Sequence, residues 1–150
     1  MSAVNDDDDG SHPAVLLSNR QTIPIEHEAL TELARRTLIA EGRNRVELSV
    51  SFVDDAEMSD LHVRYMDEAG PTDVLSFPLD DVDEHGVRLL GDVVIAPSVA
   101  ARNNPSDPEA EVRLLLVHGI LHVLGYDHEE DGERAEMWAR QERYSGVRVP

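Results

Sequence analysis

The segment from residue 112 to residue 124, VRLLLVHGILHVL, constrains the fold of this chain more than any other part of it. Its side chains are apolar around nearly every side of a helix, so a helix formed here must be buried in the protein interior. Asp107 is a favourable N-cap residue, Pro108 suits the first helical position, and Gly125 is a typical stop. We therefore expect a long buried helix between Asp107 and Gly125, with the rest of the chain packed around it.

Two histidines interrupt this apolar helix on one face. His118 and His122 are four residues apart, so both imidazoles project from the same side, one turn apart. Gly125 then ends the helix and lets the chain turn, so that His128 can return toward the same point. Three histidine ligands leave a fourth tetrahedral position open to water, which is the pattern of a catalytic zinc site. The sequence therefore predicts one Zn²⁺ ion per chain, although nickel or copper would also accept these ligands.

Hydrogen-bonded core histidines are the alternative interpretation of this pair. Two imidazoles buried without partners would cost roughly a few kcal/mol, and metal coordination is the simplest compensation. The other four histidines show no comparable spacing, and we expect them at the surface: His12, His27, His62 and His85.

Strand and helix patterns alternate along the rest of the chain. Residues 46–53 alternate apolar and polar side chains, as in a half-buried strand, and further strands are expected at residues 14–18, 74–79 and 89–96. Helices are expected from Glu26 to a stop at Gly42, from a capping box at Asp54 and Glu57 to about residue 66, after Pro97, and over residues 132–144. Pro78 should place its strand at an edge or a bulge, and residues 80–86 should form an acidic loop. These patterns predict an α+β fold (mixed α/β), with one mixed sheet of about four strands packed with about five to six helices and a zincin-like site on the buried helix.

Composition limits the classes of function. The chain has 150 residues, no cysteine and a formal net charge of −18. Without cysteine there is no disulfide framework and no thiolate metal site, and the charge argues against a broad electrostatic grip on nucleic acid. No apolar run is long enough to span a bilayer, and the acidic start is not a secretory signal, so we expect a cytoplasmic protein with no membrane association. Residues 1–13 are predicted to be a disordered acidic tail, and residues 14–150 a single domain.

The histidine spacing is similar to the metzincin protease signature HExxHxxGxxH. In that signature the second residue is the glutamate that acts as general base. Here this position is Gly119, which has no group that accepts a proton. A metallopeptidase is therefore the least favoured of the functions considered.

Three segments of the chain carry a closer resemblance. HGILHVLGYDH, PTDVLSFP (residues 71–78) and LGDVVIA (residues 90–96) together resemble the YbeY family of bacterial rRNA maturation factors, in the family's order and over roughly residues 14–144. The resemblance implies a single-strand-specific, zinc-dependent endoribonuclease that acts in 16S rRNA 3′-end maturation and ribosome quality control, with His118, His122 and His128 as metal ligands. It implies single-stranded RNA of an rRNA precursor, and the ribosome or ribosomal proteins, as partners. Many family members have an arginine where this chain has Met66, and that arginine is thought to contact RNA or support catalysis.

The general base is not identified by the sequence. Asp127 could orient a ligand or act as a base, Asp73 and Asp92 could contribute carboxylates, and Thr72 and Ser76 could offer hydroxyls to substrate, with turn and capping roles as the alternative. Residues 137 and 138, Met and Trp, are expected to pack in the core. The competing function is a metal-stabilised ribosome-assembly factor with weak or incidental nuclease activity, favoured by the net charge and by methionine at the family's arginine position.

Overall fold

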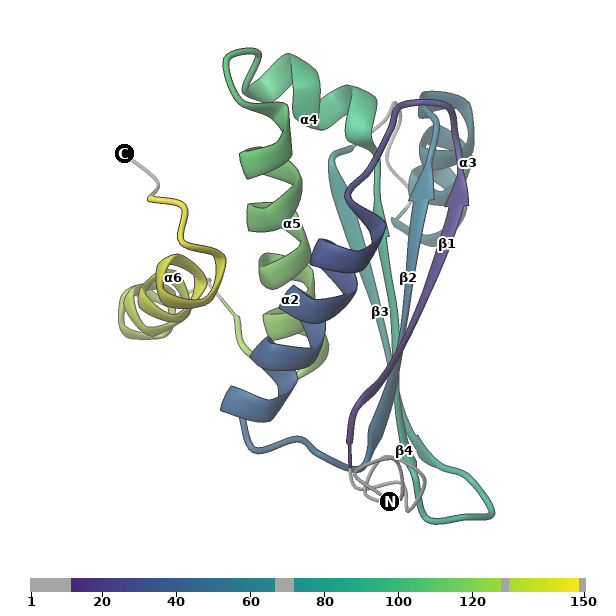
Figure 1. The fold of residues 1–150 in the computed structure, drawn as a ribbon, viewed down its shortest axis with the longest axis vertical. Helices are drawn as coiled ribbons and strands as arrows, with labels where there is room; N and C mark the ends of the chain where they lie inside the picture. The colour runs from purple at the N-terminus through teal and green to yellow at the C-terminus, as the bar shows by residue number, and fades with distance from the viewer. Residues whose placement is uncertain (1–11, 67–71, 128–129, 149–150) are drawn as a thin grey trace.

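The computed structural model describes residues 12–66, 72–127 and 130–148 (Figure 1). The helices and strands follow the chain in the order β1 (Ala14–Arg20), α2 (His27–Ala40), β2 (Val46–Val53), α3 (Asp55–Met66), β3 (Val74–Val82), β4 (Arg88–Ile95), α4 (Pro97–Asn103), α5 (Pro108–Val123) and α6 (Asp131–Ser145). Most of the predicted acidic tail lies outside the described residues.

The four strands form one mixed sheet in the order β1-β2-β4-β3. Strands β1, β2 and β4 are parallel to one another, and β3 pairs antiparallel with β4 at the edge. Together with the five helices of the described residues, this sheet confirms the predicted α+β fold.

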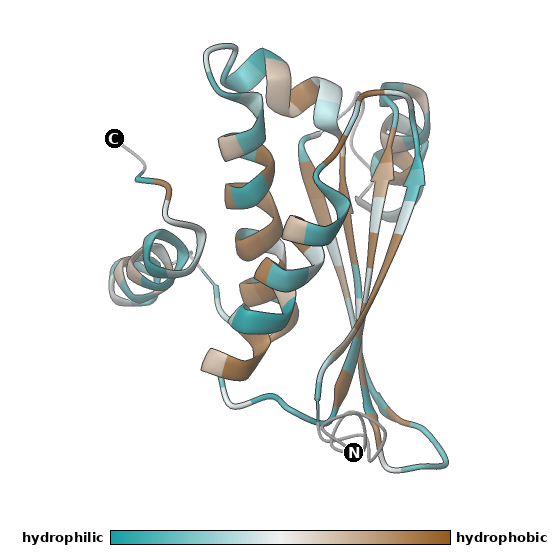
Figure 2. Ribbon diagram, viewed as in Figure 1, coloured by the Kyte–Doolittle hydropathy of each residue, from teal (hydrophilic) through white to brown (hydrophobic). Residues whose placement is uncertain are grey.

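Helices cover the two faces of the sheet unequally. Helices α2 and α5 lie side by side over one face, α4 crosses the end of the sheet, and α3 lies on the opposite face (Figure 1). The main core fills the space between the sheet and the α2–α5 layer, and a smaller core lies under α3. In Figure 2 the apolar colouring of α5 continues onto the strands behind it, while α6 on the outside is mostly hydrophilic.

Helix α5 has the boundaries that the sequence predicts. The Asp107 carboxylate accepts a hydrogen bond of 3.1 Å from the Ala110 amide, and Pro108 is the first helical residue. Nine residues of α5 are buried, as expected of a helix that is apolar nearly all round. Helix α5 contacts α2, α4, α6, β3 and β4, so it organises the fold.

The β3–β4 hairpin differs from its prediction in one respect. Residues 80–82, expected in an acidic loop, belong to β3, because Asp81 and Val82 pair with Leu89 and Arg88 after a register shift. Pro78 lies at that shift on an edge strand, as predicted, since proline cannot donate to a sheet ladder.

The capping box predicted at the start of α3 forms only in part. The Asp54 carboxylate accepts the Glu57 amide at 2.8 Å. The Glu57 carboxylate, however, binds Arg20 of β1 at 2.6 Å. The competing guanidinium is distant in sequence, so the local pattern could not predict it.

No helix within the described residues is long and apolar enough to cross a membrane.

Candidate metal centre

The site is built where α5 ends. The Gly125 amide donates to the His122 carbonyl and the Tyr126 amide donates to the Leu121 carbonyl, each at 3.0 Å. This pair of bonds is a Schellman motif, which requires a positive φ at the residue after the C-cap. Gly125 supplies it, with φ of +106°. The predicted stop at Gly125 is therefore confirmed, and the chain leaves the helix along a fixed path.

His118 and His122 face a common pocket, as their spacing predicts. Their ring centroids are 4.7 Å apart with an angle of 75° between the ring planes. Both rings line a pocket of about 380 Å³ whose other lining residues are Asp73 and four residues of β3: Val74, Leu75, Ser76 and Pro78. The two imidazoles are thus close enough to reach one ion from the same helix face.

Gln141 of α6 orients His118. Its side-chain oxygen lies 2.7 Å from Nδ1 of His118, and the residue is only 4% exposed. An amide oxygen can only accept a hydrogen bond, so Nδ1 carries the hydrogen and Nε2 of the neutral ring keeps its lone pair. Histidine ligands of metals are commonly held in this way by a second group. The hydrogen bond from Gln141 therefore gives the His118 ring the orientation that a zinc ligand needs.

Sequence reasoning does not identify this role for Gln141. The residue is 23 positions from His118 and lies on another helix. Its burial on a mostly polar helix becomes visible only in the structure.

Gly119 is fixed by packing against the sheet. A Cβ atom at this position would lie 2.5 Å from Cγ1 of Val93 on β4 and 3.3 Å from the Ser76 hydroxyl. The Ser76 hydroxyl donates to the Gly119 carbonyl at 3.2 Å, which ties β3 to α5 beside the pocket. A glutamate at position 119 would clash with Val93, so packing as well as chemistry disfavours the metzincin general base at this position.

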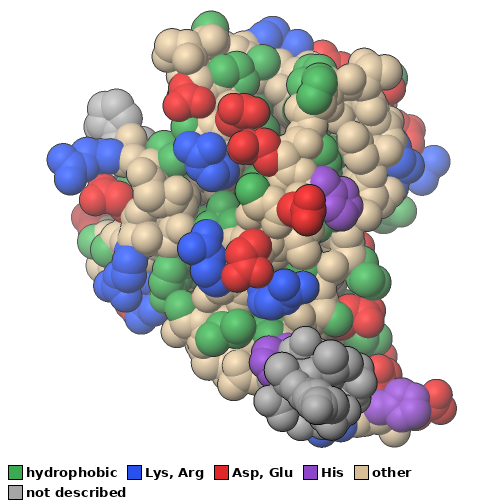
Figure 3. All heavy atoms as spheres, viewed as in Figure 1, with side chains coloured by type: hydrophobic (Ala, Val, Ile, Leu, Met, Phe, Trp, Pro, Cys, Tyr) green, Lys and Arg blue, Asp and Glu red, His purple; other side chains and the backbone are tan. Residues whose placement is uncertain are grey.

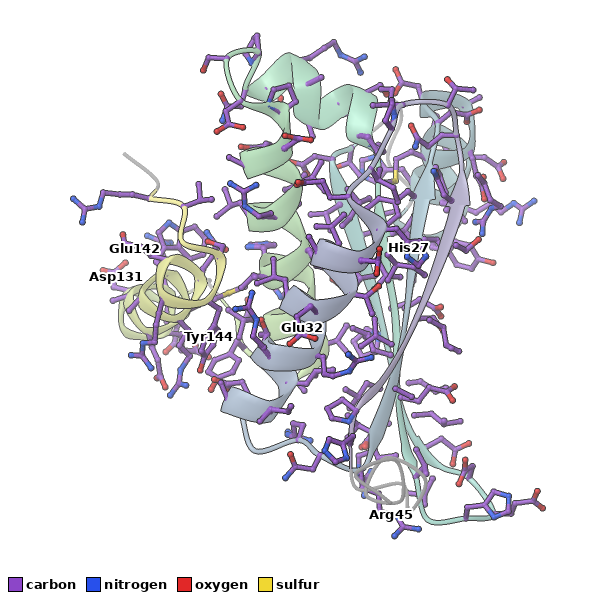
Figure 4. All side chains as sticks on the ribbon, in the orientation of Figure 1. His27, Glu32, Arg45, Asp131, Glu142 and Tyr144 are labelled. Carbon is purple, nitrogen blue, oxygen red and sulfur yellow. The ribbon has the colours of Figure 1, made fainter. Side chains whose placement is uncertain are left out.

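A buried carboxylate lies behind the turn that follows α5. Glu41, whose side chain is 6% exposed, accepts hydrogen bonds from the hydroxyls of Tyr126 and Tyr144 and from Arg140. Burial alone would raise the pKa of Glu41, but these hydrogen bonds and the charge of Arg140 outweigh it and hold that pKa below its usual value. Burial and the bond to Glu41 raise the pKa of Tyr126 to about 12. Figure 4 shows Tyr144 extending from α6 toward α2.

The structure separates the other candidate residues. Asp73 and Ser76 line the histidine pocket, but both have structural partners: the Asp73 carboxylate accepts from Asn103 at 3.3 Å, and Ser76 binds Gly119. Asp92 is exposed and adjoins Val93, which packs against the α5 side, so alternation along the strand turns Asp92 to the other face of the sheet. Thr72 is not among the residues that line the pocket.

The aromatic and sulfur side chains of α6 pack as predicted. Met137 is fully buried in the main core and Trp138 packs against it. The indole also meets the His118 ring edge to face, with centroids 5.9 Å apart. Trp138 therefore covers one side of the His118 ring.

One residue of the predicted site lies beyond what the structure describes, and the side chain at the family's arginine position is not described either. His128, the predicted third ligand, falls in the undescribed pair 128–129, and within the described residues no group of three histidine or carboxylate side chains could hold a metal ion. Met66 is the last residue of α3, and its side chain is likewise not described. Of the remaining histidines, His12, His27 and His85 are exposed and His62 is half-buried, and none lines the pocket.

Fold and site together define a class of protein: a small α+β domain with a mixed sheet, whose buried helix presents two histidines to a pocket at the sheet edge. The family model described as Endoribonuclease YbeY matches residues 16–146 of this chain. The chain therefore belongs to the YbeY endoribonuclease family, as its three sequence motifs indicate.

Individual relatives agree with this assignment. A protein of Thermobifida fusca named Endoribonuclease YbeY is 47% identical over 137 residues, which cover 83% of this chain and 87% of the relative. A protein of the same name from Mycobacterium leprae is 41% identical and covers 87% of this chain and 80% of its own length. The solution structure of a Thermotoga maritima protein superposes with a TM-score of 0.58 at 28% identity, covering 87% of this chain and 86% of that one.

Proposed function

We propose that this chain is a zinc-dependent endoribonuclease that cuts single-stranded RNA, with the 3′ end of precursor 16S rRNA as its substrate in the cytoplasm. Membership of the YbeY endoribonuclease family supports the general part of this proposal, a hydrolase that cleaves RNA internally. The zinc ion, the rRNA substrate and the ribosome as partner are the finer parts.

The pair of histidines in the β3 pocket is the observation that carries the proposal. His118 and His122 present two ring nitrogens from one helix face. The side-chain amide of Gln141 binds Nδ1 of His118, which leaves Nε2 of that ring available for a metal ion. His128 would complete the set after the turn at Gly125. One ion held by three histidines would supply a water of lowered pKa and polarise a phosphoryl oxygen.

The residues around the two histidines set the shape of the pocket. Ser76 and Gly119 hold β3 against α5 and so set the width of the pocket. Asp73 is the one carboxylate of the described residues that lines the pocket. Its partner Asn103 and the backbone bond from Ala96 to the Asp73 carbonyl give it a structural role, so we assign no general base.

The surface charge bears on how RNA is held. Acidic and arginine side chains intermingle over the face shown in Figure 3, with no broad basic region in view. The net charge of −18 argues against a wide phosphate-binding surface. We propose that the ribosome or a ribosomal protein helps to deliver the RNA. The same charge favours the second candidate, a metal-stabilised assembly factor with incidental nuclease activity.

Cleavage of a labelled single-stranded oligonucleotide with the sequence of the 16S rRNA 3′ end tests the proposal. The wild-type protein should cut it with zinc, stop cutting when a chelator removes the metal, and leave the duplex form of the same RNA intact. His122→Ala should not cut, whereas His27→Ala, which removes an exposed histidine, should cut normally. A wild-type protein that binds one zinc and small ribosomal subunits but cuts no RNA would favour the assembly factor.

The ends of the product distinguish two chemical routes. A 2′,3′-cyclic phosphate would indicate attack by the neighbouring 2′-hydroxyl of the RNA. A free 3′-hydroxyl or a linear phosphate formed directly would indicate attack by water.

A further inference from the structure

The Glu41 carboxylate accepts hydrogen bonds from three side chains that are distant from it in the sequence. Its Oε1 accepts from the Tyr126 hydroxyl at 2.7 Å, and its Oε2 accepts from Arg140 at 2.7 Å and from the Tyr144 hydroxyl. Tyr126 belongs to the turn after α5, and the other two donors belong to α6. The carboxylate is nearly fully buried, so water does not compete for these bonds.

The backbone fixes both ends of the bond between Tyr126 and Glu41. Glu41 is the C-cap of α2, where Gly42 donates to Ile39 at 2.9 Å and Arg43 donates to Leu38 at 2.8 Å. Tyr126 lies two residues beyond Leu124, the C-cap of α5, and its own amide donates to Leu121. Two helix ends of the same Schellman type thus meet through one hydroxyl and one carboxylate.

We propose that Glu41 is a positioning residue for the metal centre: by holding the Tyr126 hydroxyl it fixes the turn that joins His122 to His128. This inference rests on the proposed function, because it takes these histidines as ligands of one zinc ion. Tyr126 lies in the sequence between the last ligand on the helix and the predicted third ligand, so its anchorage restrains the backbone that directly follows α5. A ligand that is held near its bound position loses less conformational freedom when the metal binds.

Tyr144 provides a matched comparison. Its hydroxyl donates to the same carboxylate, but it lies on α6 and not in the histidine turn. Removal of either hydroxyl takes one hydrogen bond from Glu41. Only removal of the Tyr126 hydroxyl takes away the bond between Glu41 and the turn after α5. The two variants therefore distinguish an effect on the metal site from a general loss of stability.

Zinc affinity of the full-length chain, measured by competition with a chromophoric chelator, tests the inference. Tyr126→Phe should weaken zinc binding about tenfold, the lower end of the range for supporting residues around metals. Tyr144→Phe should bind zinc within about twofold of wild type. Thermal unfolding of the metal-free proteins should show similar losses for the two variants. Visible absorption of the cobalt-loaded proteins should change in Tyr126→Phe alone, because that spectrum reports the coordination geometry.

Glu41 itself is tested by a conservative and a non-conservative change. Glu41→Gln keeps an oxygen that can accept from Tyr126 and should retain most of the zinc affinity, whereas Glu41→Ala should lose at least as much as Tyr126→Phe. Equal zinc affinity in wild type and Tyr126→Phe, or equal losses in Tyr126→Phe and Tyr144→Phe, would overturn the inference and leave the proposed function standing. A wild-type chain that binds no zinc would overturn both.

Discussion

Gly119 matters both for the candidate site and for the packing of α5 against the sheet. It lies between His118 and His122, where α5 approaches Val93 so closely that an added Cβ atom would clash. The absence of a side chain therefore brings the helix against the sheet and places both imidazoles over the pocket beside β3. The same glycine that replaces the metzincin glutamate thus also sets how closely α5 packs against the sheet.

Gly119→Ala should lower the free energy of unfolding by about 1–3 kcal/mol, because the added methyl group overfills a packed contact. Urea unfolding measures the loss. Gly132→Ala is the matched control, since Gly132 lies in helix α6 with nothing within 4 Å of an added Cβ. That control should lose no stability, and an equal loss in both variants would contradict the packing argument.

Gln141 should matter through its hydrogen bond to His118. Gln141→Met keeps the approximate size of the side chain but removes the acceptor, and we expect zinc affinity to fall at least tenfold. Gln141→Glu retains an acceptor and should bind zinc nearly as wild type does. Chelator competition on the three proteins decides the point, and unchanged affinity in Gln141→Met would remove the assigned role.

At the scale of elements, the β3–β4 hairpin shows what local pattern can and cannot predict. Pro78 correctly indicated an edge strand with an irregularity, because a missing amide is a local property. The continuation of β3 through acidic residues was not predicted, since it depends on pairing with β4. Helix α5 was predicted well for the opposite reason: its cap, first-turn proline, apolar surface and terminal glycine are all local signals.

Gly91 makes the irregular part of the hairpin possible. It has φ of +123°, and a Cβ atom there would lie 2.0 Å from the Phe77 carbonyl oxygen. Gly91→Ala should lower the free energy of unfolding by more than about 3 kcal/mol, as expected where strain and a close backbone contact combine.

Gly86→Ala provides the comparison for that variant. Gly86 also has a positive φ, of +81°, but the nearest atom to an added Cβ lies 3.7 Å away. Gly86→Ala should lower the free energy of unfolding by only about 1–2 kcal/mol, which is the cost of the left-handed backbone conformation alone. Similar losses on urea unfolding of the two variants would show that the contact with Phe77 does not matter, whereas failure of Gly91→Ala to fold would agree with the prediction.

At the scale of the whole molecule, the predictable part of the site is the part that one helix carries. The spacing of His118 and His122 places them on one face without any knowledge of the fold. The contacts that support them join residues far apart in the chain: His118 with Gln141 is a separation of 23 residues, and Glu41 with Tyr126 is one of 85. Such pairs depend on how α2, α5 and α6 pack, and no local pattern in a single sequence indicates them.

The Glu41 cluster should make stability depend on pH in acid. Because the folded-state pKa of Glu41 lies below its usual value, its stabilisation is complete above the unfolded pKa of about 4.3 and is lost as the pH falls through the folded-state pKa. Glu41→Gln should therefore be less stable than wild type by about 2 kcal/mol at pH 7, and the difference should shrink below about pH 4.

Urea unfolding across this pH range measures the difference between the two proteins. Glu28→Gln, which removes an exposed carboxylate from the same helix, should follow the wild-type pH profile. A gap between wild type and Glu41→Gln that stays constant down to the acid limit would contradict the ionised state assigned to Glu41.

The zinc content of five purified proteins tests the three-histidine metal centre: wild type, His118→Ala, His122→Ala, His128→Ala and the control His27→Ala. Native mass spectrometry counts the bound ions, and circular dichroism checks that each protein is folded. We expect one zinc in wild type and in the control, and none in the three variants under the same conditions. Zinc bound by His128→Ala as tightly as by wild type would contradict the three-histidine site, and a folded wild-type protein that binds no zinc would contradict the metal centre altogether.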